Sequence, residues 1–176
     1  MSVEKAASAR KQPIVSSAHL MSEESAELSE FEYGLIVASN AFMRWVQRCM
    51  EASGNKELSS LDILVLHSVN HREREKRLND ICFVLHIEDS HTITYSLKKL
   101  VKAGLVDRRR SGKEVYYISS ELGRELCLRY RDIRENCLIA SLSAIGLENE
   151  SIGDLADRLR ALSGLYDQAA RAATSL

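Results

Sequence analysis

Apolar residues recur every three or four positions along most of this chain, and this spacing predicts a mainly helical protein. Ser29 and Ser59 each precede an acidic residue by three positions, which is the spacing of a capping box, so we expect a helix to begin at each. The pair Ser53-Gly54 is expected to end the first of these helices. The predicted buried face of the second helix consists of Leu61, Leu64, Val65 and Val69.

Two shorter helices are predicted next, one across residues 78–85 and one from Asp89 or Ser90 to Gly104. Two short helices joined by a tight turn are typical of a helix-turn-helix. The second of them has an apolar stripe at positions i, i+4, i+7 and i+8, formed by Ile93, Leu97, Leu100 and Val101. The run "HREREKR" at residues 71–77 mixes charges of both signs, and we interpret it as a solvated connection.

After Gly104 the apolar period becomes that of a β-strand. The segments "LVDRR" and "EVYYIS" are predicted to pair as a hairpin, with "RSGK" as the turn between them. Gly112 suits a turn position with positive φ, which glycine adopts without steric cost. The hairpin follows the helix-turn-helix directly, which is the arrangement of a winged helix.

Two long helices are predicted to close the chain, one over residues 120–145 that ends at Gly146 and one that begins at the capping box of Ser151 and Asp154. The expected inner face of the first consists of Leu122, Leu126, Tyr130, Ile133 and Cys137. The second carries a near-heptad seam for helix packing, formed by Ile152, Leu155, Leu159, Leu162, Tyr166 and Ala169. The predicted fold class is therefore mainly α with a small β-hairpin, a winged helix-turn-helix flanked by long helices.

Composition adds limits to this picture. The chain has 176 residues, of which 45% are apolar and 28% charged, as expected for a soluble globular protein. No apolar run approaches the roughly 18 residues of a membrane span, so we expect no membrane partner. The four cysteines lack paired spacing, which indicates a cytoplasmic protein with reduced thiols. Residues 1–28 are polar and weakly patterned, and we interpret them as an N-terminal arm that a partner surface can order.

Charge is distributed unevenly along the chain. The formal net charge is −1, yet residues 90–118 contain seven Lys and Arg residues against two acids. One basic segment on an otherwise acidic protein predicts an anion-binding patch. Three consecutive arginines, Arg108 to Arg110, lie at the centre of the predicted hairpin.

The segments "LSSLDILVLHSV", "LNDICFVLHIEDSHTITYSLKKLVKAGLVDRR" and "SGKEVYYIS" resemble the MarR family of winged-helix transcription regulators. The resemblance implies a homodimer that binds double-stranded DNA and, in many relatives, a small-molecule effector. It implies a first dimerisation helix at residues 29–57, a winged helix-turn-helix at 58–119 and C-terminal dimerisation helices at 120–176. The wing is shorter than is usual in the family, and a Ser-Ser pair replaces the usual Leu-Thr before the next helix. An effector pocket of the family kind would draw on Phe42, Trp45, Tyr130 and Tyr166.

A major groove admits one α-helix, which needs polar side chains on its outer face and apolar anchors behind them. Base readout is expected from the N-terminal half of the predicted recognition helix, through Ser90, His91, Thr92, Thr94 and Tyr95. Phosphate contacts are expected from Lys98, Lys99 and Lys102. Arginines on a narrow hairpin suit the minor groove, which predicts DNA contacts from Arg108, Arg109, Arg110 and Lys113. Because side chains alternate along a strand, we expect Arg109 and Arg110 to face DNA and Arg108 to turn back towards an acid.

Other functions fit particular residues. A winged-helix module that binds a protein instead of DNA would use the same basic face. His67 with His71, and Cys82 with His86, have the i, i+4 spacing of zinc ligands. Cys127 and Cys137 lie near several arginines, the setting of an oxidant-sensing thiol. The sequence contains no nucleophile elbow, phosphate-cradling glycine loop or catalytic triad, so we expect neither enzymatic activity nor a cofactor.

Overall fold

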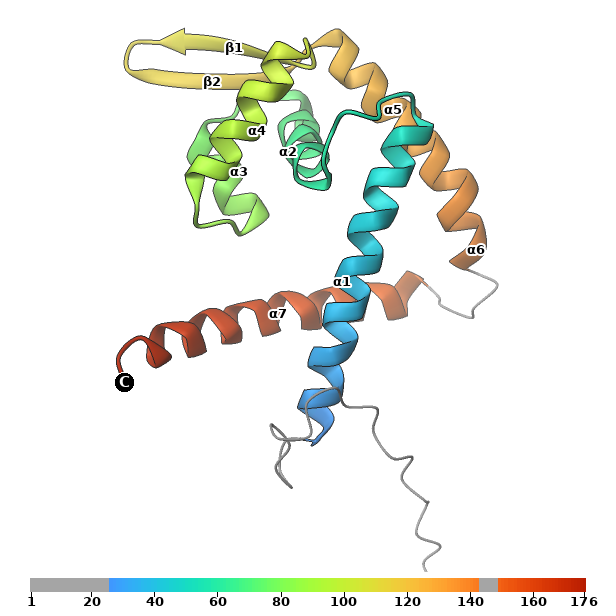
Figure 1. The fold of residues 1–176 in the computed structure, drawn as a ribbon, viewed down its shortest axis with the longest axis vertical. Coiled ribbons are helices and arrows are strands. Elements are labelled where there is room, and N and C mark those ends of the chain that lie inside the picture. The colour runs from blue at the N-terminus through green and yellow to red at the C-terminus, as the bar shows by residue number, and fades with distance from the viewer. Residues whose placement is uncertain (1–25, 143–148) are drawn as a thin grey trace, which may run out of the picture.

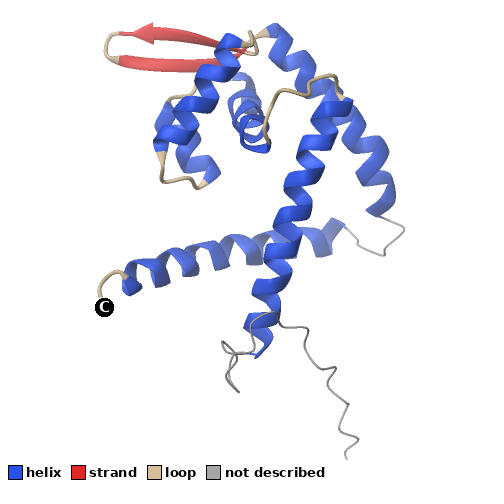
Figure 2. Ribbon diagram, viewed as in Figure 1, coloured by secondary structure: helices blue, strands red, loops and turns tan. Residues whose placement is uncertain are grey.

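The computed structural model describes residues 26–142 and 149–176, and most of them are helical (Figure 1). The α-helices are α1 (Ala26–Ala52), α2 (Ser60–Asn70), α3 (Leu78–Leu85), α4 (Ser90–Lys102), α5 (Glu121–Arg134), α6 (Ala140–Leu142) and α7 (Asn149–Ala173). A 3₁₀ turn, His71–Glu73, follows α2, and a π-helical segment, Glu135–Ile139, joins α5 to α6. Figure 2 shows the single hairpin of the described residues, made of β1 (Val106–Ser111) and β2 (Glu114–Ser119). The predicted fold class, mainly α with a small β-hairpin, is confirmed.

Helices α2, α3 and α4 pack together, and the hairpin extends from their edge (Figure 1). Helix α3 ends at His86, whose left-handed conformation (φ 56°) allows a short connection into α4. The strands pair in antiparallel register from Val106 opposite Ser119 to Ser111 opposite Glu114. This order, helix-turn-helix followed by a hairpin, is that of a winged helix.

The hydrophobic core lies between the winged-helix elements and the adjoining ends of α1 and α5. Its fully buried residues include Val46, Cys49 and Met50 of α1, Ile63, Val65, Leu66 and Val69 of α2, Ile81 of α3, and Ile93, Leu97 and Leu100 of α4. Helix α5 adds Leu126, Cys127 and Tyr130. Burying these side chains against one another is the main stabilisation of the fold. It fixes α4 on its inner side and leaves its opposite side to solvent.

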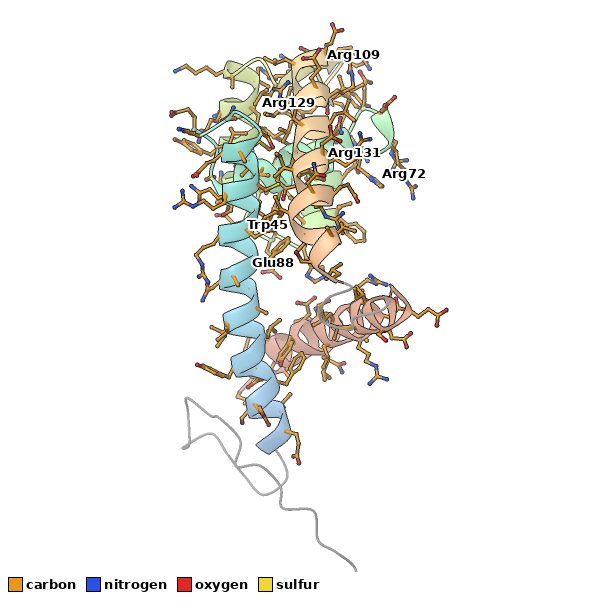
Figure 3. The ribbon with its side chains drawn as sticks, turned by 90° about the vertical axis from the view of Figure 1, so that its right-hand side faces the viewer. Trp45, Arg72, Glu88, Arg109, Arg129 and Arg131 are labelled. Carbon is orange, nitrogen blue, oxygen red and sulfur yellow. The ribbon has the colours of Figure 1, made fainter. Side chains whose placement is uncertain are left out.

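The long helices extend beyond this core. Only the C-terminal third of α1 packs against α2 and α5, and every residue from 34 to 44 is exposed. Helix α7 crosses α1 below the winged helix, where Tyr166 donates a hydrogen bond to Glu32 at 3.1 Å (Figure 1). Figure 3 shows α1 and α5 side by side, with α7 lying across α1 below them. No described helix combines the length and hydropathy needed to cross a bilayer.

Several local predictions are confirmed by backbone geometry. Ser59 and Asp62 form the predicted capping box of α2. Asp89, one of the two predicted caps of α4, accepts a hydrogen bond from the backbone of His91 at 2.9 Å. Gly104 (φ 72°) ends α4 and Gly112 (φ 61°) lies in the hairpin turn, both with the positive φ that glycine tolerates.

Other predicted boundaries are wrong. Ser29 and Ser151 lie inside helices, because the described residues of α1 start at Ala26 and those of α7 at Asn149. Strand β1 continues to Ser111, which shortens the predicted four-residue turn to two residues. On α2, Val65 and Val69 are buried as predicted, but Leu61 and Leu64 are only half-buried. The predicted helix end at Gly146 lies outside the described residues.

Candidate nucleic-acid interface

Helix α4 presents a continuous outer face to solvent. Ile93, Leu97 and Leu100 are fully buried and hold the helix on the core. Since side chains three or four positions apart share a helix face, the opposite side carries His91, Tyr95, Lys98 and Lys102, all of them exposed. Tyr95 exposes 72% of its surface, which is a large fraction for an aromatic side chain. Two of the predicted readout residues, His91 and Tyr95, and two of the predicted phosphate residues, Lys98 and Lys102, therefore lie on one accessible surface.

The N-terminal turn of α4 is fixed by its own hydroxyl groups. Thr92 Oγ1 donates to the carbonyl oxygen of Asp89 at 2.8 Å, and Thr94 Oγ1 donates to that of Ser90 at 2.8 Å. Two hydrogen bonds hold the pKa of Asp89 below its ordinary value: the larger effect comes from the backbone of His91 and the next from the side chain of Thr92. The two threonine hydroxyls keep free lone pairs towards solvent, where they can accept hydrogen bonds.

Lys99 lies on the flank of α4, beside the N-terminus of α2. Its Nζ atom donates to Asp62 Oδ2 at 2.7 Å and to the carbonyl oxygen of Glu57 at 2.6 Å. Asp62 also accepts from Ser96 Oγ at 2.7 Å and from the backbone of Ser59 at 2.9 Å. Burial raises the pKa of Asp62, but the hydrogen bonds from Lys99, Ser96 and Ser59 together keep it below its ordinary value. Lys99, predicted to contact phosphate, is thus paired with a carboxylate of α2.

The hairpin holds one of its three arginines against an acid. Arg109 donates from Nε and Nη2 to the two carboxylate oxygens of Glu75, at 2.7 and 2.6 Å, and its guanidinium lies 5.3 Å from the centre of the Tyr116 ring. This pairing lowers the pKa of Glu75 and raises that of Arg109. We expected Arg108 to make such a pair, and this detail is wrong, because the segment before α3 lies beside Arg109. Figure 3 shows Arg109 at the wing end of the molecule.

Five cations of the basic segment make no ion pair within the described ranges. They are Lys98 and Lys102 of α4, and Arg108, Arg110 and Lys113 of the hairpin. Between α4 and the hairpin lies a hollow of about 350 Å³, whose walls include Lys98, Lys102 and Arg108. Cations that surround a hollow and lack acidic partners create a positive potential suited to an anion.

Lys76 and Glu75 make contacts beside the candidate site that the sequence did not reveal. Lys76 is buried, and its Nζ atom donates to the carbonyl oxygens of Val69 (2.9 Å) and His71 at the end of α2. Its backbone pairs with that of Tyr117, which ties the hairpin to the segment before α3. Burial lowers the pKa of Lys76. The interpretation of residues 71–77 as a solvated connection holds for six of the seven residues, which are exposed, and not for Lys76. No pattern in the mixed charges distinguishes Lys76 or Glu75 from their neighbours.

The thiols and histidines form no other evident centre in the described part of the chain. Burial raises the pKa of the Cys127 thiol to about 11 and also raises the pKa values of Cys49 and Cys82. A thiol with a raised pKa is a poor nucleophile near neutral pH, which leaves Cys137 as the exposed thiol. No three His, Cys, Asp or Glu side chains in residues 26–142 and 149–176 come together as a metal site.

A second hollow, of about 350 Å³, lies between α2 and α5. It is lined in part by His67, Asn70 and Tyr130. The rings of His67 and Tyr130 pack edge to face, with their centres 4.5 Å apart. His67 Nε2 and Asn70 Oδ1 are buried and find no hydrogen-bond partner among the described residues. Burial lowers the pKa of His67, which favours the neutral ring. Arg131 and Arg134 stand at the rim.

The aromatic residues predicted to line an effector pocket occupy different places. Of the four, Tyr130 lines this hollow. Trp45 is half-buried on α1, where Phe42 is 51% exposed. Tyr166 is on α7 and bonds to Glu32.

Comparisons with known proteins agree with this geometry. Residues 58–123 match the family described as "Winged helix DNA-binding domain". BldR from Sulfolobus solfataricus has a TM-score of 0.64 and 20% identity, over 82% of this chain and 99% of BldR. A cysteine-to-serine variant of MarR from E. coli, complexed with operator DNA, has a TM-score of 0.63 and 17% identity, over 80% of this chain and 99% of that one. Staphylococcus aureus MarR, in complex with salicylate and kanamycin, has a TM-score of 0.65 and 14% identity, over 81% of this chain and 93% of that one. No curated protein sequence gives a significant match.

These matches show that residues 58–123 form a winged-helix DNA-binding domain and that the chain has the fold of MarR-family regulators. The resemblance read from the sequence is therefore confirmed at the level of the fold.

Proposed function

We propose that this chain is a homodimeric, cytoplasmic regulator of transcription that binds double-stranded DNA in the manner of the MarR family. The observation that carries the proposal is the set of five cations on α4 and the hairpin that make no ion pair with any described residue, within a domain that matches the winged-helix DNA-binding family. A nearly neutral protein that concentrates such cations on one exposed helix face and the adjacent hairpin has the electrostatic footprint of a nucleic-acid binder.

In this proposal α4 enters the major groove and the hairpin reaches the adjacent minor groove. The groups that read bases are on the exposed N-terminal half of α4 and comprise Ser90, His91, Thr92, Thr94 and Tyr95. The cations that neutralise phosphates or enter the minor groove are Lys98, Lys102, Arg108, Arg110 and Lys113. Lys99 and Arg109 belong to the same surface, but each is engaged by an acid.

A second copy of the chain accounts for the apolar surface of the long helices. Residues 34–44 of α1 are mostly apolar and all exposed, and α7 exposes Leu155 (52%) and Leu159 (37%) along its near-heptad seam. Monomeric proteins rarely expose apolar patches of this extent. Two copies would cover these faces and would hold two recognition helices at the spacing of a pseudo-palindromic site.

Selection of bound sequences from a random duplex pool tests the proposal. We expect enrichment of a sequence with two-fold symmetry, because each protomer of a dimer reads one half-site. Binding to unselected duplex should weaken steeply with salt. If each protomer neutralises about five phosphates, the slope of log K against log salt approaches about −9 for the dimer. A protein that binds no duplex even at low salt would instead be a winged-helix module for a protein partner, and the proposal would be wrong.

We also propose that the hollow between α2 and α5 binds a small organic anion as an effector. Two buried polar atoms of residues that line it, His67 Nε2 and Asn70 Oδ1, lack hydrogen-bond partners in the described part of the chain, and such atoms are costly unless a ligand or water satisfies them. Arg131 and Arg134 also line the hollow, and each forms an exposed ion pair with the next residue, Asp132 at 2.9 Å and Glu135 at 3.5 Å, which a bound anion would compete with. A ligand between α2 and α5 would contact both the winged helix and a helix of the proposed dimer layer.

Salicylate is a suitable probe, because it is a small aromatic anion and is present in the S. aureus MarR structure. We expect salicylate to raise the melting temperature and to weaken duplex binding. Asn70→Ala should weaken salicylate binding about tenfold, since it removes a polar partner within the hollow. His71→Ala, which changes an exposed side chain outside the lining, should leave it unchanged. Equal effects of the two substitutions would place the ligand elsewhere.

A further inference from the structure

We propose that Lys99 is a positioning residue, which together with Ser96 fixes the orientation of α4 on Asp62 and does not neutralise a DNA phosphate. This inference rests on the proposed DNA-binding function, which it deepens. It assigns different roles to two adjacent lysines, Lys98 and Lys99, that composition alone would treat alike.

The contacts of Asp62 join three parts of the domain. Ser96 and Lys99, one turn apart on α4, reach its two carboxylate oxygens, both at 2.7 Å. Ser59, the cap of α2, donates to the same carboxylate from its backbone (2.9 Å) and its hydroxyl (2.8 Å). Lys99 also holds the carbonyl oxygen of Glu57, just before that cap. A single buried carboxylate thus ties the recognition helix to the first turn of α2.

The hydrogen bonds to Asp62 fix the rotation of α4 about its own axis, which its apolar contacts do not fix. Burial of Ile93, Leu97 and Leu100 holds the helix on the core, but hydrophobic attraction has no direction. Hydrogen bonds have strict limits of distance and angle, so two of them, one turn apart on the same flank, resist rotation of the helix about its axis. Rotation would move His91 and Tyr95 away from the base edges together, because both are on the face opposite the buried stripe.

The charge of Lys99 is paired with the carboxylate of Asp62. Asp62 retains only 3% of its side-chain exposure, and an ionised carboxylate this buried needs its partners. Moving the ammonium of Lys99 to a phosphate would remove the only cation among the hydrogen-bond donors to Asp62 in the described structure. Lys98 is exposed and has no acidic partner among the described residues, so its charge is free for a phosphate.

The experiment compares Lys99→Met with Lys98→Met in the full-length protein. Affinity is measured for the selected duplex and for random-sequence duplex between about 50 and 200 mM salt. Lys98→Met should reduce the salt slope by about 0.9 per protomer, as expected when one phosphate contact is lost. Lys99→Met should leave the slope unchanged. It should lower the ratio of selected to random affinity about tenfold or more, because base contacts lose their alignment. A positioning role alters this ratio, whereas a residue needed only for folding would lower the amount of active protein and leave it unchanged.

Ser96→Ala is the second variant, and it applies even if Lys99→Met fails to fold. It removes one hydrogen bond to Asp62 and no charge, so the slope must stay unchanged while the ratio falls. Lys99→Arg, which can still donate to both oxygens, should restore part of the ratio. The inference is wrong if Lys99→Met reduces the slope as Lys98→Met does, or if neither Lys99→Met nor Ser96→Ala changes the ratio. If the unaltered protein binds no duplex at all, the proposed function fails, and this outcome is distinct from both.

Discussion

Replacing Gly123 by alanine is expected to lower the free energy of unfolding by about 3 kcal/mol, although alanine is the better helix former. Gly123 lies in the first turn of α5, where a Cβ atom would stand 2.0 Å from the carbonyl oxygen of Leu105 and 3.0 Å from its carbonyl carbon. Both are backbone atoms, so no rotation of a side chain relieves the overlap, and the helix or the segment before β1 must move.

Movement of α5 would break further contacts at the same place. Ser120 caps the helix by accepting from the backbone of Gly123 at 3.0 Å, and its own backbone donates to Leu105 at 3.1 Å. Ser120 Oγ also donates to the carbonyl oxygen of Gly104 at 2.6 Å. Loss of such a cap alone costs about 1 kcal/mol. These bonds join the hairpin to α5, so the variant should also loosen the link between the wing and the long helices.

Gly164→Ala is the matched control for this prediction. Gly164 is in the interior of α7 and is exposed, and no atom of residues 26–142 or 149–176 would lie within 4 Å of an added Cβ. Its replacement should raise the free energy of unfolding by up to about 1 kcal/mol, through helix propensity alone. Urea denaturation, monitored by circular dichroism, gives the free energy of unfolding of both variants. A Gly123→Ala protein as stable as its Gly164→Ala counterpart would mean that the backbone at Leu105 can move aside without lowering the free energy of unfolding.

The sequence predicted the elements of the winged helix well and their ends less well. Capping at Ser59 and positive φ at Gly104 and Gly112 depend on local chemistry, which a sequence displays directly. Ser29 and Ser151 have the spacing of a capping box, yet each lies inside a helix, so this spacing alone does not mark where a helix begins. The buried face of α2 was only half right, because Asp62 belongs to the core side through its partners on α4.

The candidate site was predictable by residue type but not by pairing. The basic segment is visible as a count of charges, and its outer helix face follows from the period of Ile93 and Leu97. Its acidic partners, Asp62 and Glu75, are 37 and 34 positions before the cations they hold, and no local pattern links such distant residues. Folding therefore divides the cations into those held by acids and those left free, and this division decides which ones can meet a phosphate.

Replacing Leu159 by glutamate is expected to convert the proposed dimer into monomers and to weaken binding of the selected duplex by about 100-fold or more. Leu159 lies on the exposed seam of α7, and a charge there would have to be buried against the second copy. A monomer presents one recognition helix, so the second half-site no longer adds to affinity. Each winged helix should stay folded, because no residue of α7 belongs to its core.

Gln168→Glu is the control, because it adds the same charge to an exposed position on the side of α7 opposite the seam. Light scattering coupled to size-exclusion chromatography gives the mass of each variant, and fluorescence anisotropy gives its affinity for the selected duplex. We expect a dimer with unchanged affinity for Gln168→Glu and a monomer with weak affinity for Leu159→Glu. A Leu159→Glu protein that remains a dimer would remove the α7 seam from the interface. A monomer that retains full affinity would show that one winged helix is sufficient and that the second copy is not required for binding.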